Sequence, residues 1–381
     1  MNKFKTHFCM VSQQAAPNLL PLLDNDMKPE KVVLLVTPQM QKQADYLQQV
    51  IKPRGIEVVQ QPLELIDDFK AMEDQLIGLI DHEPDGEIAL NVTGGTKWMA
   101  IAAQEVFRMK GAGIFYVKVE DDKVLFLDGD PASHTLSQRI DLKSYIQAYG
   151  YQFREQSQPT GLPPKLREFC EQLVAKVDIW QGAIGQLNWL ASVAESQNSL
   201  SVPIARHLQA QDPQFNVLLT ECYQADLLAK KADDQVHFSD ENARTLANGG
   251  WLEAYVSSTL NELKGEGVIQ DSPRLNQHIQ RIGATSHNEI DVCFMARNRL
   301  HLIECKTKRL AGKGTADAAT DTVYKLDSIS DLGGLGTKSM LVSYRKLNKA
   351  DQKRAKDLRI KVIQGTDIRN LKSGLRDWIK Q

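Results

Sequence analysis

Three charged residues in the last third of the chain have the types and spacing of a reactive centre. Asp291 lies on one strand-like segment, and Glu304 and Lys306 lie on the next one. The two segments are joined by a short turn at Arg297-Asn298. Glu304 and Lys306 share a face, because alternate residues of a strand point the same way. If the turn has two residues, Asp291 stands opposite Glu304, and a shift of two residues would place it opposite Lys306. Both registers predict that two acids and a lysine converge.

Converging carboxylates repel each other unless a divalent cation lies between them, and hard oxygen ligands suit magnesium or manganese. A lysine beside such an ion can position or deprotonate a water, or offset the charge that develops on a phosphate. The chemistry that this set could perform is hydrolysis of a phosphodiester. The alternative is an internal salt bridge between Lys306 and either acid. Apolar residues on both faces of the hairpin favour catalysis, because charges at the end of a buried sheet are costly.

The sequence around these charges resembles the PD-(D/E)xK nucleases over about residues 245–381. The shared pattern is Asp291 followed by Glu304-Cys305-Lys306, between a helix bearing Gly250-Trp251-Leu252-Glu253 and a helix bearing Tyr324-Lys325-Leu326. The resemblance implies that Asp291 and Glu304 bind the metal. It also implies that the backbone carbonyl of Cys305 completes the metal shell and that Lys306 is the catalytic lysine.

Further candidates follow from the same resemblance. Glu253 matches an acid that some members place on the first helix, where it binds the metal directly or through water; a helix-surface acid is the equal alternative. Tyr324 and Lys325 are weaker candidates for contacts with the scissile phosphate. Glu289, one strand pair before Asp291, is the alternative to that acid.

A second constellation is a loop that reads Thr93-Gly94-Gly95-Thr96-Lys97. It leaves a predicted strand and opens a predicted helix, so its glycines allow a tight turn while backbone amides face outwards and can bind an anion. The spacing matches neither the Walker loop nor Gly-x-Gly-x-x-Gly, which disfavours ATP hydrolysis and NAD binding. The alternative is a tight strand-helix turn in which Thr96 is only the N-cap.

Two other loops are expected to converge on this one. Ser12 follows the first predicted strand and Thr37 follows the second, and the carboxyl ends of parallel strands line a ligand crevice. The arrangement resembles the CARF domain, the CRISPR-associated sensor of cyclic oligoadenylates, over about residues 1–150. The resemblance implies ligand contacts from Ser12, Thr93, Gly94, Gly95, Thr96 and Lys97, with Thr37 and Asn18 as weaker candidates. CARF domains pair with the ring across a two-fold axis, which implies a homodimer.

The two resemblances together point to the CARF-domain effector nucleases of type III CRISPR systems, the Can and Card family in particular. They imply a metal-dependent endonuclease that cleaves DNA or RNA in antiviral defence and is activated by a cyclic oligoadenylate, with the tetra-adenylate as the expected ring. The helical middle section would transmit the signal. Two alternatives stay open: a non-catalytic, ligand-responsive DNA-binding regulator, and a DNA-repair or restriction nuclease that binds an ordinary nucleotide.

The elements that must position both constellations follow from hydrophobic periodicity. In residues 1–150, a Rossmann-like parallel sheet is predicted from strands at 4–11, 31–37, 55–60, 87–92 and 114–119 and helices at 14–27, 39–52, 67–82 and 97–110. A strand at 124–127 would form a hairpin with the last of these strands.

Two further domains are expected. Residues 151–245 form a helical or winged-helix-like connector, with helices at 165–177, 183–195 and 215–229 and a short ribbon at 230–238. Residues 246–381 form a restriction-endonuclease-like α/β domain, with helices at 251–264 and 317–330 and strands at 277–283, 289–296, 300–307 and 339–344. The predicted fold class is α/β.

The composition is that of a globular chain of 381 residues with 42% hydrophobic residues. Five cysteines without a Cys-x-x-Cys pair suggest neither a disulfide framework nor a zinc knuckle. The net charge of -2 hides a division: residues 292–381 carry 20 Lys and Arg against 9 Asp and Glu, and the preceding residues are acidic overall. A basic last third suits a nucleic acid, although a solvated basic helix is the alternative. No apolar run is long enough to span a membrane, and no secretion signal is present, so a cytoplasmic location is expected.

Overall fold

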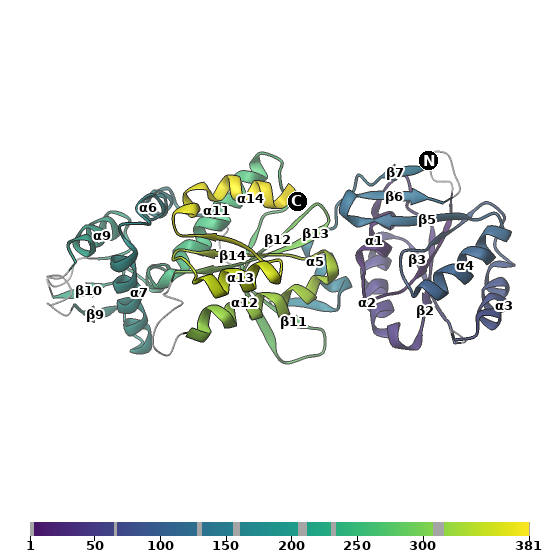
Figure 1. Cartoon of the computed structure of the whole chain (residues 1–381), viewed down its shortest axis with the longest axis horizontal. Coiled ribbons are helices and arrows are strands. Elements are labelled where there is room, and N and C mark those ends of the chain that lie inside the picture. Colours follow the sequence, from purple (N-terminus) through teal and green to yellow (C-terminus); the bar gives the residue numbers. More distant parts are fainter. Residues whose placement is uncertain are drawn as a thin grey trace.

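The computed structural model describes residues 4–64, 67–127, 132–154, 161–204, 212–229, 234–307 and 316–380. The chain is elongated, and its parts lie in a row (Figure 1). The N-terminal sheet with its helices lies at one end, the C-terminal sheet lies in the centre, and a helical connector lies at the other end. Within these described ranges, no helix has the length and apolar character needed to span a bilayer.

The N-terminal sheet has the strand order β3-β2-β1-β4-β5-β6-β7. Its strands are β1 (Thr6–Met10), β2 (Lys31–Val36), β3 (Glu57–Pro62), β4 (Ile88–Asn91), β5 (Gly113–Lys118), β6 (Lys123–Phe126) and β7 (Ser133–Thr135). The first five are parallel, and β6 and β7 are antiparallel additions. The predicted Rossmann-like sheet and its terminal hairpin are thus confirmed.

Helices cover both faces of this sheet because alternate strand residues are apolar on each side. Phe8 and Met10 pack on one face with α3 (Phe69–Ile80) and α4 (Lys97–Met109), and Cys9 packs on the other with α1 (Ala16–Leu23) and α2 (Gln41–Ile51). The order of strands reverses between β1 and β4. The loops that follow these two strands therefore flank the switch point, where ligands of such sheets bind.

The C-terminal sheet has the strand order β15-β14-β13-β12-β11-β8. Its strands are β8 (Tyr151–Arg154), β11 (Arg274–Arg281), β12 (His287–Ala296), β13 (Arg299–Lys306), β14 (Lys338–Ser343) and β15 (Lys361–Gln364). β8 to β13 are antiparallel, whereas β13, β14 and β15 are parallel. Sequence reasoning places residues 151–154 in the connector, but they form β8 of this sheet because they pair with β11.

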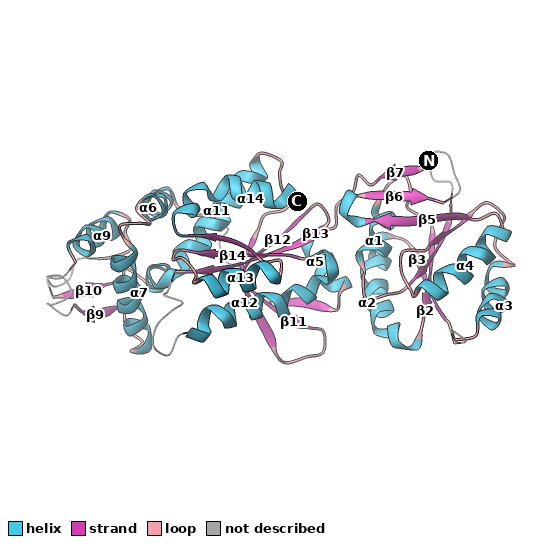
Figure 2. Cartoon of the chain, in the orientation of Figure 1, coloured by secondary structure: helices cyan, strands magenta, loops and turns pink. Residues whose placement is uncertain are grey.

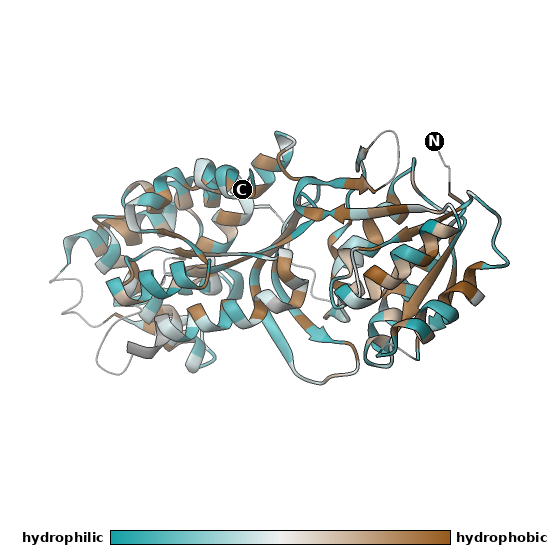
Figure 3. Cartoon of the chain, turned by 45° about the vertical axis from the view of Figure 1, so that its right-hand side comes forward, coloured by the Kyte–Doolittle hydropathy of each residue, from teal (hydrophilic) through white to brown (hydrophobic). Residues whose placement is uncertain are grey.

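Four helices sandwich this sheet (Figure 2). α11 (Trp251–Gly265) and α14 (Leu371–Lys380) pack on one face, and α12 (Ala316–Ser330) and α13 (Lys349–Asp357) pack on the other. The middle strands β13 and β14 are largely hydrophobic, and polar residues line the outer sides of the helices (Figure 3). The α/β class predicted for this domain is confirmed.

The connector consists of α6 (Pro164–Ala175), α7 (Gln181–Ser196), α9 (Pro213–Gln224) and a ribbon of β9 (Ser201–Pro203) with β10 (Gln235–His237). The ribbon differs from the expected one, since β10 pairs with a strand that precedes α9; residues 230–233 lie outside the described residues. α10 (Glu241–Thr245) and a π-helical turn, η4 (Leu246–Gly250), lead into α11.

The N-terminal domain contacts the C-terminal domain directly. α5 (Leu142–Ala148) is the last helix of the N-terminal domain. Tyr145 of α5 and Tyr149, which follows it, share a hydrophobic core with Leu300 and Leu302 of β13. The connector lies at the opposite end of the C-terminal domain (Figure 1). The N-terminal domain therefore meets the C-terminal domain without the connector between them, whereas sequence reasoning expects the connector to transmit the signal.

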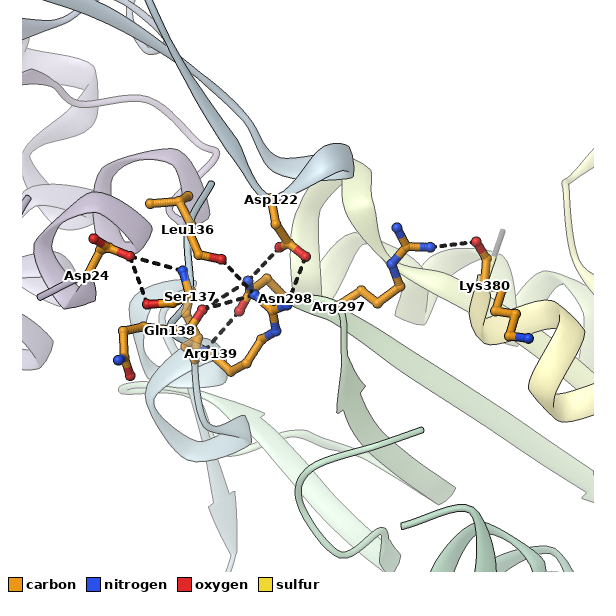
Figure 4. A network of polar contacts seen from close by, with 10 residues as sticks. Asp24, Asp122, Leu136, Ser137, Gln138, Arg139, Arg297, Asn298 and Lys380 are labelled. Atoms are coloured by element: carbon orange, nitrogen blue, oxygen red, sulfur yellow. Dashed lines mark hydrogen bonds and ion pairs between the residues drawn. The ribbon is translucent and has the colours of Figure 1, made fainter. Parts of the chain in front are cut away.

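Polar contacts reinforce this interface at the turn between β12 and β13 (Figure 4). Asn298 is 2% exposed, and its Oδ1 accepts from the Ile140 amide at 3.0 Å. Its Nδ2 donates to Asp122 Oδ1 at 2.7 Å, and Asp122 also pairs with Arg139. One turn of the C-terminal sheet is thus held by Asp122 and Ile140 of the N-terminal domain.

Candidate active site and ligand cavity

The hairpin of β12 and β13 has the register that the two-residue turn predicts. Ala296 faces Arg299, and the last paired residues are Val292 and Ile303. Arg297 and Asn298 both have positive φ, as a primed two-residue turn requires. Asp291 stands one position beyond the ladder, opposite Glu304, and its Oδ2 accepts from the Cys305 amide at 2.7 Å. A side chain thus replaces a strand hydrogen bond at the point where the charges meet.

Glu304 lies at the centre of the charged cluster and is 2% exposed. Lys306 Nζ lies 2.6 Å from its Oε1, and Lys325 Nζ lies 3.1 Å from each of its oxygens. Lys325 comes from α12, so the cluster joins the strand pair β12–β13 to a helix. The salt bridge that sequence reasoning weighs against catalysis is present, but a structural salt bridge needs one lysine rather than two.

Burial and repulsion from neighbouring carboxylates raise the pKa values of two acids in the cluster. Burial, with the charge of Glu304 next, raises the pKa of Asp291 to about 6. Burial, followed by the charge of Asp291, raises the pKa of Glu253 to about 7, and Asn276 hydrogen-bonds to Glu253. Burial alone would lower the pKa of Lys306, but Glu304 and Asp291 outweigh it and hold that pKa above its usual value. These acids carry repulsion that a cation could relieve.

The donor set fits a hard divalent cation, since it consists of carboxylate oxygens, and neighbouring carboxylate charges help to raise the pKa of Asp291 and of Glu253. Glu253, Asp291 and Glu304 do not all bring an oxygen within 4.8 Å of one another, however. Lys306 and Lys325 pair with the carboxylate oxygens of Glu304. The acids are therefore close enough to repel one another, but their oxygens do not all converge on a single metal position.

The other residues expected at the active centre do not all reach the charged cluster. Cys305 lies within the cluster, and burial raises the pKa of its thiol well above the usual value, which excludes a thiolate nucleophile at neutral pH. Glu289 is exposed on β12, opposite His278, and does not reach the cluster. Tyr324 is half exposed, and the Arg354 guanidinium carbon lies 5.5 Å from its ring centre.

Among the described residues, one group has its potential ligand atoms within 4.8 Å: Asp24, Asp26 and His134. Asp24 Oδ1 contacts His134 Nε2 and accepts from the Asp26 amide, and its Oδ2 accepts from the amide and hydroxyl of Ser137. Both oxygens are therefore engaged in fastening the end of α1 to the segment after β7.

A cavity of about 430 Å³ lies at the switch point of the N-terminal sheet. Its lining residues are Val11, Ser12, Gln13, Thr37, Gln39, Met40, Gly95, Thr96 and Met99. The three predicted loops thus converge, and they bring together Ser12, Thr37, Gly95 and Thr96. Thr93, Gly94 and Lys97 are not among the lining residues.

Hydrogen bonds explain the roles of the loop residues. Thr93 Oγ1 donates to Asn91 Oδ1 at 2.6 Å and accepts from the Val117 amide at 2.7 Å, so this hydroxyl fixes the loop to β5. Thr96 Oγ1 accepts from the Met99 amide and is the N-cap of α4. Buried Asn18 donates to the Met10 carbonyl. Thr93 and Asn18 thus hold the structure around the cavity without lining it, whereas Thr96 both caps α4 and lines the cavity.

The glycines make room for that loop. A Cβ on Gly94 would lie 2.1 Å from the Met10 carbonyl oxygen, and Gly95 has a φ of +72°. Lys97 is exposed at the first position of α4. The start of α4 therefore presents backbone amides and one cation next to the cavity, as an anion site requires.

Two family models match the chain. Residues 6–145 match the Card1 CARF domain, and residues 240–381 match the endonuclease domain of Card1-like proteins. Protein VC1899 from Vibrio cholerae is 27% identical, with a TM-score of 0.89 over 98% of each chain. Among curated proteins there is no match.

Can2 from Sulfobacillus thermosulfidooxidans, solved in complex with cyclic tetra-adenylate, is 29% identical. Its TM-score is 0.81, and the match covers 98% of this chain and 99% of Can2. A type III CRISPR defence DNA nuclease activated by cyclic oligoadenylate shows a likeness of fold alone. It is 20% identical, with a TM-score of 0.55, over 91% of this chain and 46% of that one.

Proposed function

Since the chain belongs to the CARF-domain effector nucleases of the Can and Card family, we propose that it hydrolyses nucleic acid in a metal-dependent reaction switched on by a cyclic oligoadenylate. The observation that carries the proposal is the pair of buried acids Asp291 and Glu304 with Lys306 and Lys325 beside them, on the same chain as a cavity formed by three sensor loops. The mixed sheet with helices on both faces supports a PD-(D/E)xK fold for the nuclease.

At the active centre, Asp291, Glu304 and Glu253 would hold a magnesium or manganese ion, with the backbone carbonyl of Cys305 as a further ligand. The ion would polarise the phosphate and the attacking water. Because the pKa of Lys306 is raised, this lysine stays protonated and acts as a cation that orients water or offsets phosphate charge. Lys325 adds a second positive charge from α12.

In the sensor, the ligand would be cyclic tetra-adenylate, the compound present in the Can2 structure. Ser12, Thr37 and Thr96 would meet it from the cavity wall, and Gly94 and Gly95 would offer backbone amides. Thr93 would act by fixing the loop, and Lys97 would approach a phosphate from the start of α4. The sensor, connector and nuclease would span residues 1–150, 151–245 and 246–381, with β8 contributed to the nuclease sheet.

We infer that the active form is a homodimer. Along α4, Trp98, Ile101 and Met109 are 49, 57 and 70% exposed. Such a row of large apolar side chains on a helix beside the ligand cavity is a surface that a second copy would cover. A cyclic ligand also has the symmetry that two identical cavities require. In the cell, this activity would serve antiviral defence in the cytoplasm.

The test uses the purified chain with labelled single-stranded DNA, double-stranded DNA and RNA. Each substrate is incubated with magnesium, manganese or chelator, with and without cyclic tetra-adenylate. We expect cleavage only when ligand and metal are both present. Glu304→Gln, which keeps the shape of a buried side chain that two lysines contact, should bind the ligand and cleave nothing. Cleavage without ligand would favour a repair or restriction nuclease, and DNA binding without cleavage would favour a regulator.

A further inference from the structure

One contact ties the nuclease to the sensor at the turn between β12 and β13. Asn298, in the turn of the hairpin that carries Asp291 and Glu304, donates to Asp122 (Figure 4). It also accepts from the Ile140 amide. On its other side, Arg297 donates to the Lys380 carbonyl at 2.6 Å, which fastens the same turn to the end of α14. The hairpin is thus fixed at its turn.

A second contact begins at the cavity itself. The Ser12 hydroxyl, which lines the cavity, accepts from the Gln14 amide at 3.2 Å and donates to the Gln14 carbonyl at 3.4 Å. The side chain of Gln14 points to the other domain, where its Oε1 accepts from the Leu335 amide at 3.0 Å. A ligand oxygen that accepts from the Ser12 hydroxyl must compete with the Gln14 carbonyl for its proton.

The segment that Gln14 meets is η5 (Asp331–Gly336), and its glycines permit the approach. Gly334 has a φ of +69°, and a Cβ there would lie 2.5 Å from Gln14 Oε1. The Tyr145 hydroxyl donates to the Gly333 carbonyl at 2.6 Å. η5 is therefore held by two residues of the sensor, one of which shares a turn with a cavity residue.

η5 follows α12 without a break. Nine residues before Gly334, Lys325 projects from α12 onto Glu304. The buried residues Val323, Leu326 and Ile329 pack α12 against its neighbours, so a displacement of its end would move the helix as a unit. With the hairpin fixed at Asn298, such a motion of η5 would change the position of Lys325 relative to Glu304.

We propose that Gln14 is a positioning residue that couples the ligand cavity to the active centre through η5 and α12. This inference rests on the proposed function, and it names the path by which the ligand regulates the same site. The ligand shifts α12 only to the extent that it binds the shifted arrangement more tightly. Gln14 acts through its side-chain oxygen, so a substitution can remove this acceptor and keep the size of the side chain.

The experiment compares three full-length variants with the wild type. Gln14→Met keeps the length of the side chain and removes the acceptor, whereas Gln14→Glu restores an acceptor. Gln61→Met makes the same exchange on edge strand β3, away from the cavity and the interface. For each protein, affinity for cyclic tetra-adenylate is measured by calorimetry, kcat at saturating ligand by cleavage, and ligand-induced change by hydrogen exchange of amides 320–336.

We expect Gln14→Met to lose roughly tenfold of the stimulation by ligand, which lies within the usual range of allosteric coupling. Its exchange response in 320–336 should disappear. Its affinity for cyclic tetra-adenylate should be equal to or higher than that of the wild type, because a decoupled sensor binds without moving α12. Gln14→Glu and Gln61→Met should behave like the wild type.

Several results would overturn the coupling. Wild-type stimulation or exchange in Gln14→Met would show that the contact transmits nothing. If Gln14→Met lost affinity for cyclic tetra-adenylate together with stimulation, Gln14 would be a ligand contact. If Gln14→Glu did not restore stimulation, the side-chain acceptor would not be what couples the two sites. A wild type that cyclic tetra-adenylate does not stimulate would instead overturn the proposed function, and the coupling with it.

Discussion

Replacing Asp291 by asparagine should stabilise the metal-free protein while it abolishes cleavage. The pKa of Asp291 is about 6 in the folded chain, against an ordinary value of 3.8, because the carboxyl is buried beside Glu304. Between these two values, the folded chain holds a proton that the unfolded chain has lost. Stability therefore falls as the pH rises through this window and stays low above it.

The size of the effect follows from the shift. One pKa unit corresponds to about 1.4 kcal/mol, so a shift of about two units gives a cost of about 3 kcal/mol above pH 6. Asparagine carries no charge, and its Oδ1 can still accept from the Cys305 amide. The free energy of unfolding of Asp291→Asn should exceed that of the wild type by about 1–3 kcal/mol at pH 8, and the difference should vanish near pH 4.

Urea denaturation in chelator at several pH values provides the assay. Trp251 and Trp378 are buried in the core of the nuclease domain, so their fluorescence reports its unfolding. Glu289→Gln is the control, since Glu289 is an exposed acid on the same strand and should have no effect. Magnesium should stabilise the wild type more than Asp291→Asn. If the variant is no more stable at pH 8, or equally more stable at pH 4, the repulsion argument is refuted.

The remaining predictions concern catalysis and binding. Lys306→Ala should lower cleavage by roughly 10²–10³ without changing affinity for cyclic tetra-adenylate, because the lysine offsets charge only in the reaction; unchanged cleavage would place the catalytic cation elsewhere. Lys97→Ala should remove one charged contact of about 1.5–3 kcal/mol in each protomer, so a dimer should bind the ligand more weakly by roughly a hundredfold or more. Saturating ligand should restore cleavage. The basic residues of 292–381 should make substrate binding fall by roughly a thousandfold between about 50 and 200 mM salt if six phosphates are contacted; a flat salt dependence in a filter-binding assay would assign the charge to a solvated surface.

Local patterns were enough to predict the hairpin at the active centre. Strand periodicity and a two-residue turn determine the register, and the register places Asp291 opposite Glu304. Convergence of the three sensor loops followed in the same way from parallel strands. Both predictions needed only short-range geometry and the rules of sheet formation.

What the sequence did not disclose depends on contacts between distant residues. Leu335 and Gln14 are 321 positions apart, and Asn298 and Asp122 are 176 apart. Nothing in either neighbourhood signals its partner. Thr93 illustrates a different limit, because a threonine beside a helix start suits a ligand contact equally well, and only the distances to Asn91 and Val117 assign its hydroxyl to the fold.

The edge position of β8 has a consequence for how such proteins arise and are made. β8 precedes the connector in sequence, yet it pairs with β11, whose sequence lies more than a hundred residues later. During synthesis, β8 leaves the ribosome before its partner β11. The N-terminal domain is therefore complete before the C-terminal sheet can form. A gene fragment that begins at residue 246 would encode a sheet in which β11 pairs only with β12, and its exposed edge would be prone to aggregation. Recombination that gives this nuclease a different sensor must therefore carry β8 along, so the unit of exchange is longer than the nuclease sequence itself.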